Sequence, residues 1–206
     1  HDLIKEYATQ HQRIVFNGNG YAPEWEKEAR RRGLPVLPSM VDAIPALTTD
    51  KAVELFGEFG VFTKTELESR AEIQYEIYAK AINIEAKTMV DMATKQIIPA
   101  VIKYTTVLAE SINQVKAVGP IDVSVQMDLL KKASKLLKEV NSTMNKLSKL
   151  VDQIETHPEG RDRAVFCREK LVPAMEKLRE PVDELEMLVD KDMWPMPSYG
   201  DLVFEP

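Results

Sequence analysis

The sequence has 206 residues, with 33 acidic and 27 basic side chains and a formal net charge of −6. This length fits one domain with an appended segment, and a hydrophobic content of 44% can fill a core. The acidic balance disfavours nucleic acids and anionic membranes as partners, because both are bound by clustered Lys and Arg. The chain has a single cysteine, Cys167, so no internal disulfide can form. It has no run of 18 apolar residues, so no membrane-spanning helix is predicted. The first residue is His1, and no apolar signal core follows it, so we expect a cytoplasmic fragment of a longer protein.

The composition predicts an all-α fold. The sequence has only eight glycines, and its Val and Ile residues are scattered, whereas strands normally appear as short runs between Gly-rich turns. We expect an antiparallel bundle of three long helices, preceded by a short irregular and helical segment and followed by an extended tail. The expected limits are 1–62 for the N-terminal segment, packed on the first long helix, 63–190 for the bundle and 191–206 for the tail.

The N-terminal segment contains one amphipathic stretch, one turn and one firmly predicted helix. Residues 1–12 place their apolar side chains on one side, and Asn17–Gly20 reads Asn-Gly-Asn-Gly, a strong turn signal. A helix over Pro23–Arg32 has Pro in its first turn, Glu early and Arg late, which matches the helix dipole. Gly33 supplies the stop, and residues 34–49 read as a proline-rich connector.

The first long helix begins at a capping box, in which Thr63 and Glu66 satisfy free backbone N–H groups reciprocally. Apolar residues then recur at spacings of three and four as far as Gly119. A helix of roughly 55 residues would be about 80 Å long. Pro99 lies inside this pattern, and we expect it to bend the helix without ending it.

Two further long helices are predicted. The second begins at Asp122 or Ser124 and ends near His157, and the third covers Arg161 to about Leu188, with kinks at its prolines, Pro173 and Pro181. The first helix is longer than its partners, and we expect residues 1–60 to cover the excess, because an apolar stripe would otherwise face water.

The tail is expected to be extended, because aromatic residues from Trp194 to Phe204 alternate with prolines. It resembles a strap that docks on a surface, either on this bundle or on a missing domain or partner. Deletion of residues 193–206 is expected to weaken assembly more than substrate affinity.

No residue pattern predicts a catalytic or metal centre. The three histidines, His1, His11 and His157, are far apart and lack the spacing of metal ligands. Cys167 has no histidine nearby and is expected to pack in the core. Asn17–Gly20 lacks the spacing of a phosphate-binding loop, so a turn is favoured and ligand contact is the alternative.

Charged and methionine side chains are interpreted as structural. The carboxylates on the first long helix are expected to be solvated, and the arginines near the start of the third helix are expected to pair locally, although an anion site is the alternative. The methionines are expected in the core rather than in a binding groove. These residues are Glu66, Glu68, Glu72, Glu76 and Glu85; Arg161, Arg163 and Arg168; and Met89, Met92, Met144 and Met175.

Four strings of residues, in order and spacing, make the chain resemble the C-terminal region of type III glutamine synthetase, the large bacterial form. The resemblance covers about Lys5 to Phe204. The strings are Arg13–Tyr21 (RIVFNGNGY), Ile82–Met89 (INIEAKTM), Gln96–Ala100 (QIIPA) and Trp194–Leu202 (WPMPSYGDL).

This resemblance implies a parent enzyme that joins ammonia to glutamate with ATP and Mg²⁺ or Mn²⁺, in a large double-ringed homo-oligomer. It implies that the metal-binding and catalytic residues lie in an upstream catalytic domain, which would be the partner of this segment. No position here matches those motifs, so the resemblance assigns no catalytic, cofactor-binding or metal residue to this chain. The expected function is therefore structural, in assembly or regulation, and an independent helical scaffold or adaptor is the alternative.

Overall fold

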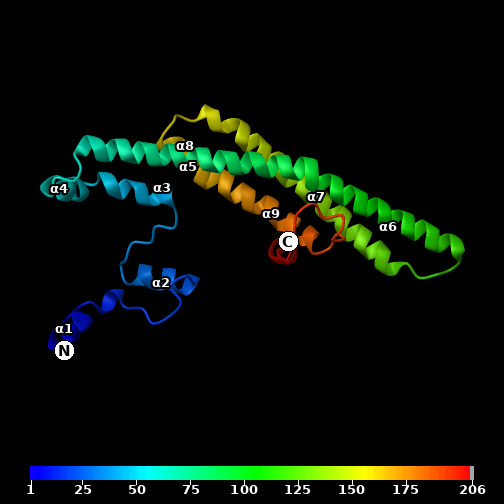
Figure 1. Cartoon of the computed structure of the whole chain (residues 1–206), viewed down its shortest axis with the longest axis horizontal. Helices are drawn as coiled ribbons and strands as arrows, with labels where there is room; N and C mark the ends of the chain where they lie inside the picture. The colour runs from blue at the N-terminus through cyan, green and yellow to red at the C-terminus, as the bar shows by residue number, and fades with distance from the viewer. Residues whose placement is uncertain (205–206) are drawn as a thin grey trace. The chain divides into compact units, whose positions relative to one another are not determined.

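A computed structural model of the chain describes residues 1–204, and its described part divides into two compact units at Ala43 and Ile44 (Figure 1). The helices of the first unit are α1 (Asp2–Gln10), the 3₁₀ turn η1 (Gln12–Ile14), α2 (Pro23–Arg31) and α3 (Met40–Ala43). Those of the second unit are η2 (Ile44–Thr48), α4 (Asp50–Glu58), α5 (Lys64–Met92), η3 (Ala93–Ile97), α6 (Ile98–Val118), α7 (Ser124–Gln153), η4 (Ile154–Thr156), α8 (Arg161–Phe166), η5 (Cys167–Leu171), α9 (Val172–Glu186) and α10 (Tyr199–Phe204). No strand occurs in residues 1–204, and the predicted all-α class is confirmed.

Helix α2 forms for the reasons that its sequence predicts. Pro23 occupies the first turn, where its missing N–H is not needed, and Glu24 and Glu26 lie near the positive end of the dipole. At the other end, Gly33 adopts a φ of 70°, and the Leu34 N–H donates to the Ala29 carbonyl oxygen. This Schellman-type ending fixes the position of Arg32, the last residue before the glycine.

The predicted first long helix is present as α5, η3 and α6, which run without interruption from Lys64 to Val118. Its capping box is confirmed: the Thr63 N–H donates to Glu66 Oε2 at 2.7 Å, and the Glu66 N–H donates to Thr63 Oγ1 at 3.3 Å. The Thr63 contact also lowers the pKa of the Glu66 carboxyl group, because it favours the ionised form.

Proline is accommodated inside two helices by a wider turn. η3 and η5 are π-helical segments, and each ends two residues before a proline, Pro99 and Pro173 respectively. A proline has no N–H to donate, and its ring clashes with the carbonyl four residues earlier. We infer that the π-helical spacing moves that carbonyl aside, so each helix continues. Pro181, in contrast, lies buried within the continuous helix α9.

The core of the second unit is built around α7. This helix packs against α6 and α9, and α5 packs against η2, α8 and α9; Figure 1 shows α7 returning beside the long helix. The largest fully buried side chains come from all of these long helices and include Leu67, Val101, Leu147, Leu171 and Leu178. Of residues 1–60, which were expected to cover the first part of the long helix, η2 and α4 pack on α5 in this unit, and α8, from the start of the third helix, packs on it as well.

The tail differs from the prediction. Residues 199–204 form a helical turn, α10, instead of an extended strand. Ser198 and Asp201 cap it: the Ser198 N–H donates to Asp201 Oδ2 at 2.7 Å, and the Asp201 N–H donates to Ser198 Oγ at 3.3 Å. Lys191 Nζ lies 2.7 Å from Asp201 Oδ1, and these contacts together lower the Asp201 pKa to about 2. None of the helices in the described residues is long and apolar enough to span a membrane.

Candidate functional site

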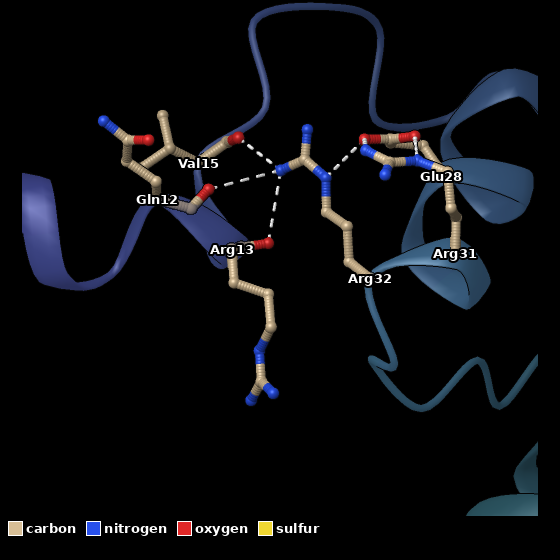
Figure 2. Close-up of polar contacts among 6 residues, drawn as sticks. All are labelled: Gln12, Arg13, Val15, Glu28, Arg31 and Arg32. Carbon is tan, nitrogen blue, oxygen red and sulfur yellow. Dashed lines mark hydrogen bonds and ion pairs between the residues drawn. The ribbon is translucent and has the colours of Figure 1, made fainter.

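Arg32 is the centre of the most extensive polar contact in the first unit (Figure 2). Its Nη1 donates to the Val15 carbonyl oxygen at 2.5 Å and also lies 3.2 Å and 3.4 Å from the carbonyl oxygens of Arg13 and Gln12. Its Nε donates to Glu28 Oε1 at 2.6 Å, one turn back along α2. Arg32 thus ties the chain around η1, 17 to 20 residues earlier, to the end of α2. We call this arrangement the Arg32 clamp.

Glu28 orients two arginines at once. Arg31 donates to both carboxylate oxygens, with distances of 2.7 and 2.6 Å, while Arg32 donates to one of them. Hydrogen bonds from Arg31 and then Arg32 lower the pKa of Glu28 to about 2. The Arg32 side chain is only 18% exposed, against 73% for Arg31, so Arg32 has the more buried role.

Two aromatic rings surround the clamp. The centroids of Phe16 and Trp25 are 4.6 Å apart, and the Arg32 guanidinium carbon lies 5.9 and 5.8 Å from them. Gly18 packs so closely on Phe16 that a Cβ there would lie 2.6 Å from the ring. A side chain at this position would displace the ring from Trp25, which explains the glycine.

The predicted turn is present beside this cluster, shifted two residues along the chain. The Ala22 N–H donates to the Asn19 carbonyl oxygen at 3.1 Å, and the Tyr21 N–H donates to Asn19 Oδ1 at 3.0 Å. The Tyr21 side chain is fully exposed, at 101%. The turn therefore exposes an aromatic side chain to solvent, while the residues just before it are held by the Arg32 clamp and by the contact between Phe16 and Trp25.

A cleft of about 760 Å³ lies between η2, α4, α5 and α8. Its lining includes Lys64, Glu68, Glu72, Tyr75 and Arg161. Tyr75 is 4% exposed, and this burial raises the pKa of its hydroxyl group, while Arg161 nearby acts in the opposite sense. The five predicted carboxylates of α5 are all exposed, as expected.

Of the three arginines at the start of the third helix, Arg163 forms local pairs, as predicted. Arg163 lies 3.6 Å from Glu159 and 3.5 Å from Glu155, and it donates to the His157 carbonyl oxygen at 3.0 Å. Arg161 instead faces the cleft near Tyr75.

The methionine prediction is confirmed for Met144 and wrong for Met89 and Met92, while Met175 is only half-buried. Met144 is buried, but Met89 and Met92 line an open apolar groove of about 420 Å³ between α5, η3 and α9. Met196 of the tail also lines this groove. The tail therefore contacts its own bundle through Met196, and the Trp194 Nε1 is buried beside it without a hydrogen-bond partner.

The histidines and the cysteine are divided between the two units, with His1 and His11 in the first and His157 and Cys167 in the second. His1 and His11 are exposed in the first unit, and the ring of His157 stacks on Phe166 with centroids 4.0 Å apart. Cys167 is fully buried; its Sγ lies 4.0 Å from the Ala79 carbonyl oxygen, and burial raises the pKa of its thiol. Within residues 1–204 no group of three or more His, Cys, Asp or Glu side chains could hold a metal ion.

Two features were missed by sequence reasoning. Ser198-x-x-Asp201 before Leu202-Val203-Phe204 is a capping box preceding an apolar run, and this signal would have predicted α10. The Arg32 clamp has no comparable signal, because its carbonyl partners are backbone groups that any residues supply.

Comparison with known proteins shows the family of this chain. The family model "Glutamine synthetase C-terminal domain" matches residues 1–116. A glutamine synthetase of Butyrivibrio fibrisolvens is 34% identical over 204 residues, covering 98% of this chain and 29% of the relative. A type-3 glutamine synthetase of Dictyostelium discoideum is 33% identical over 207 residues, and a glutamine synthetase of Bacteroides fragilis is 30% identical over 210 residues, each covering 98% of this chain and 28% of the relative.

The chain therefore spans less than a third of the length of these relatives. The match to the family model covers more than half of it, and the relatives match it almost end to end. This chain belongs to the glutamine synthetase C-terminal domain family.

Proposed function

We propose that this chain is the helical scaffold of a glutamine synthetase and acts in the assembly of that enzyme, without a catalytic site of its own. Its partners would be the catalytic part of the same polypeptide and neighbouring subunits of a homo-oligomer. The reaction of the whole enzyme would be the ATP-dependent ligation of ammonia to glutamate, with Mg²⁺ or Mn²⁺, in the cytoplasm.

The observation that supports an assembly role is the apolar surface of α10. Tyr199, Leu202, Val203 and Phe204 are all exposed, and Phe204 is 84% exposed. A helical turn with four large apolar side chains in water is a typical protein-interaction feature. Asp201 holds this turn to the rest of the unit through Lys191 and Ser198, so the surface is presented in a fixed place.

We propose that the cofactors of the whole enzyme bind outside this chain. In residues 1–204 no group of three or more His, Cys, Asp or Glu side chains could hold a metal ion, and this supports the proposal that the metal of the whole enzyme binds elsewhere. We therefore assign no step of the ligation to this chain, and we propose that the catalytic residues lie in the part of the polypeptide outside these 206 residues.

The test uses the full-length enzyme with two exposed side chains of α10 made polar, Leu202→Ser with Val203→Ser. Removal of the whole tail is less specific, because Met196 and the half-buried Trp194 pack on the bundle. The double variant is expected to lower the oligomer mass measured by light scattering, while KM for glutamate changes less than about two-fold, because no substrate contact is altered.

The matched control is Ile84→Ser on α5, which also replaces an exposed apolar side chain. It is expected to leave the oligomer mass unchanged. An unchanged mass in the α10 variant, or an equal loss of mass in both variants, would refute an assembly role for this tail.

A further inference from the structure

We propose that the loop Asn17–Tyr21 is a preorganised docking knob, with Tyr21 at its tip, that inserts into the catalytic part of the glutamine synthetase polypeptide. This inference rests on the proposed function and names the contact surface through which the scaffold would be attached.

The composition of the loop fits a protein interface. From Val15 to Pro23 nine consecutive residues carry no charge, in a chain whose charged content is 29%. The centres of protein interfaces are depleted in charged residues and enriched in tyrosine. Tyrosine beside Asn and Gly also provides a large contact area with little loss of side-chain entropy.

The loop is held in one conformation by contacts that involve its base rather than its tip. The Arg32 clamp fixes the carbonyl groups of Gln12, Arg13 and Val15, which precede the loop (Figure 2). Phe16 is packed on Trp25, and Gly18 lies against Phe16. A loop that is already ordered loses less conformational entropy on binding, so its contacts contribute more to affinity.

The tip itself has no packing partner within its unit. Tyr21 is 101% exposed, although the residues around it are tightly organised. Burial of such a side chain needs a concave surface with apolar walls and a hydrogen-bond acceptor for the hydroxyl group. Because the relatives are more than three times as long as the matched region, most of the enzyme lies outside this chain and can provide that surface.

A cysteine reporter next to Tyr21 can measure its burial without removing it. Gly20→Cys is suitable, because a Cβ at Gly20 meets no atom within 4 Å, and the buried Cys167 does not compete for the reagent. The rate of maleimide labelling at this site, followed by peptide mass mapping, is compared between the 206-residue chain and the full-length enzyme. Lys27→Cys, at an exposed position on α2, is the matched control.

We expect the Gly20→Cys site to be labelled at least about ten-fold more slowly in the full-length enzyme, because a docked tyrosine behaves as an interface hot spot. The Lys27→Cys site should be labelled at the same rate in both proteins. Adding Tyr21→Ala to the Gly20→Cys variant should return labelling to the rate of the 206-residue chain.

Equal labelling of Gly20→Cys in both proteins would overturn the docking knob. If the α10 variant still dissociated the enzyme, the proposed assembly role would remain valid although the docking knob had failed. If the α10 variant also had no effect, both proposals would fail. Slow labelling in the 206-residue chain that depended on its concentration would identify a second copy of this chain as the partner, which would equally contradict the inference.

Discussion

At the scale of single residues, the best-defined feature is the carboxylate of Glu28 between Arg31 and Arg32. Sequence patterns predicted all three residues as helix-forming charges placed to suit the dipole. They did not predict that Arg32 would reach back to three carbonyl groups, because such partners are set by the path of the chain and not by residue type. For Tyr75 the apolar stripe on the long helix predicted burial, but it did not predict which elements cover it, because packing between elements is not a local signal.

Arg32→Lys is expected to loosen the first unit. Lysine has no planar fork, so it cannot bond Glu28 and the carbonyl of Val15 together as the guanidinium does. Hydrogen bonds of charged groups contribute about 1.5–3 kcal/mol, and we expect a loss of that order in the free energy of unfolding, with faster hydrogen exchange at the Tyr21 and Ala22 amides.

Arg31→Lys is the control, because Arg31 is largely exposed and solvent screens its ion pair with Glu28, so this substitution is expected to change stability little. Equal effects of the two substitutions in hydrogen exchange would show that Arg32 has no special role.

The Glu28 carboxylate also predicts a dependence on pH. Its pKa is about 2 in the folded chain, below the ordinary glutamate value of 4.5, so the folded state binds a proton less readily than the unfolded state. Its stabilising effect is therefore fully present above pH 4.5 and is lost as the pH falls from 4.5 towards 2. An NMR titration of the Glu28 side chain should give a midpoint well below 4, and a midpoint near 4.5 would mean that the arginine contacts are not formed in solution.

At the scale of elements, the sequence predicted most helix limits because they depend on local chemistry. The capping box at Thr63 and the glycine after α2 are signals contained within a few residues. The π-helical segments before Pro99 and Pro173 were not predicted, because a single wider turn hardly changes the spacing of apolar residues in the sequence. The methionine prediction failed for a related reason, since periodicity gives the face of a helix but not whether a neighbour covers it.

The connection between α7 and α8 depends on a glycine. Gly160 has a φ of 81° and a ψ of −137°, a conformation almost restricted to glycine, and a Cβ there would overlap Glu72 Oε2. Gly160→Ala is expected to lower the free energy of unfolding by about 1–3 kcal/mol from backbone strain. Chemical denaturation of the variant measures this loss.

Glu72→Ala, combined with Gly160→Ala, distinguishes backbone strain from steric overlap with Glu72 as the reason for the glycine. The Glu72 side chain is exposed and can move away, so we expect the double variant to remain as unstable as Gly160→Ala alone. Full recovery in the double variant would mean that the steric overlap, and not the backbone, requires the glycine.

At the scale of the whole molecule, the sequence predicted the fold class, which the structure confirms, and the family, which the comparisons confirm. Family membership could be predicted because strings such as Phe16–Tyr21 and Trp194–Leu202 are specific in order and spacing. The structure adds that these two strings contribute the exposed Tyr21 and the apolar α10, respectively. We therefore propose that both strings contact the rest of the enzyme and take no part in its chemistry.

The most direct test of this account is a glutamine-forming assay on the purified 206-residue chain, with ATP, magnesium, glutamate and ammonia, beside the full-length enzyme as a positive control. The account predicts no glutamine above the blank from the chain, while its circular dichroism shows that it is helical. Turnover that co-purified with the chain would contradict it, because a catalytic site would then lie among residues that we interpret as structural.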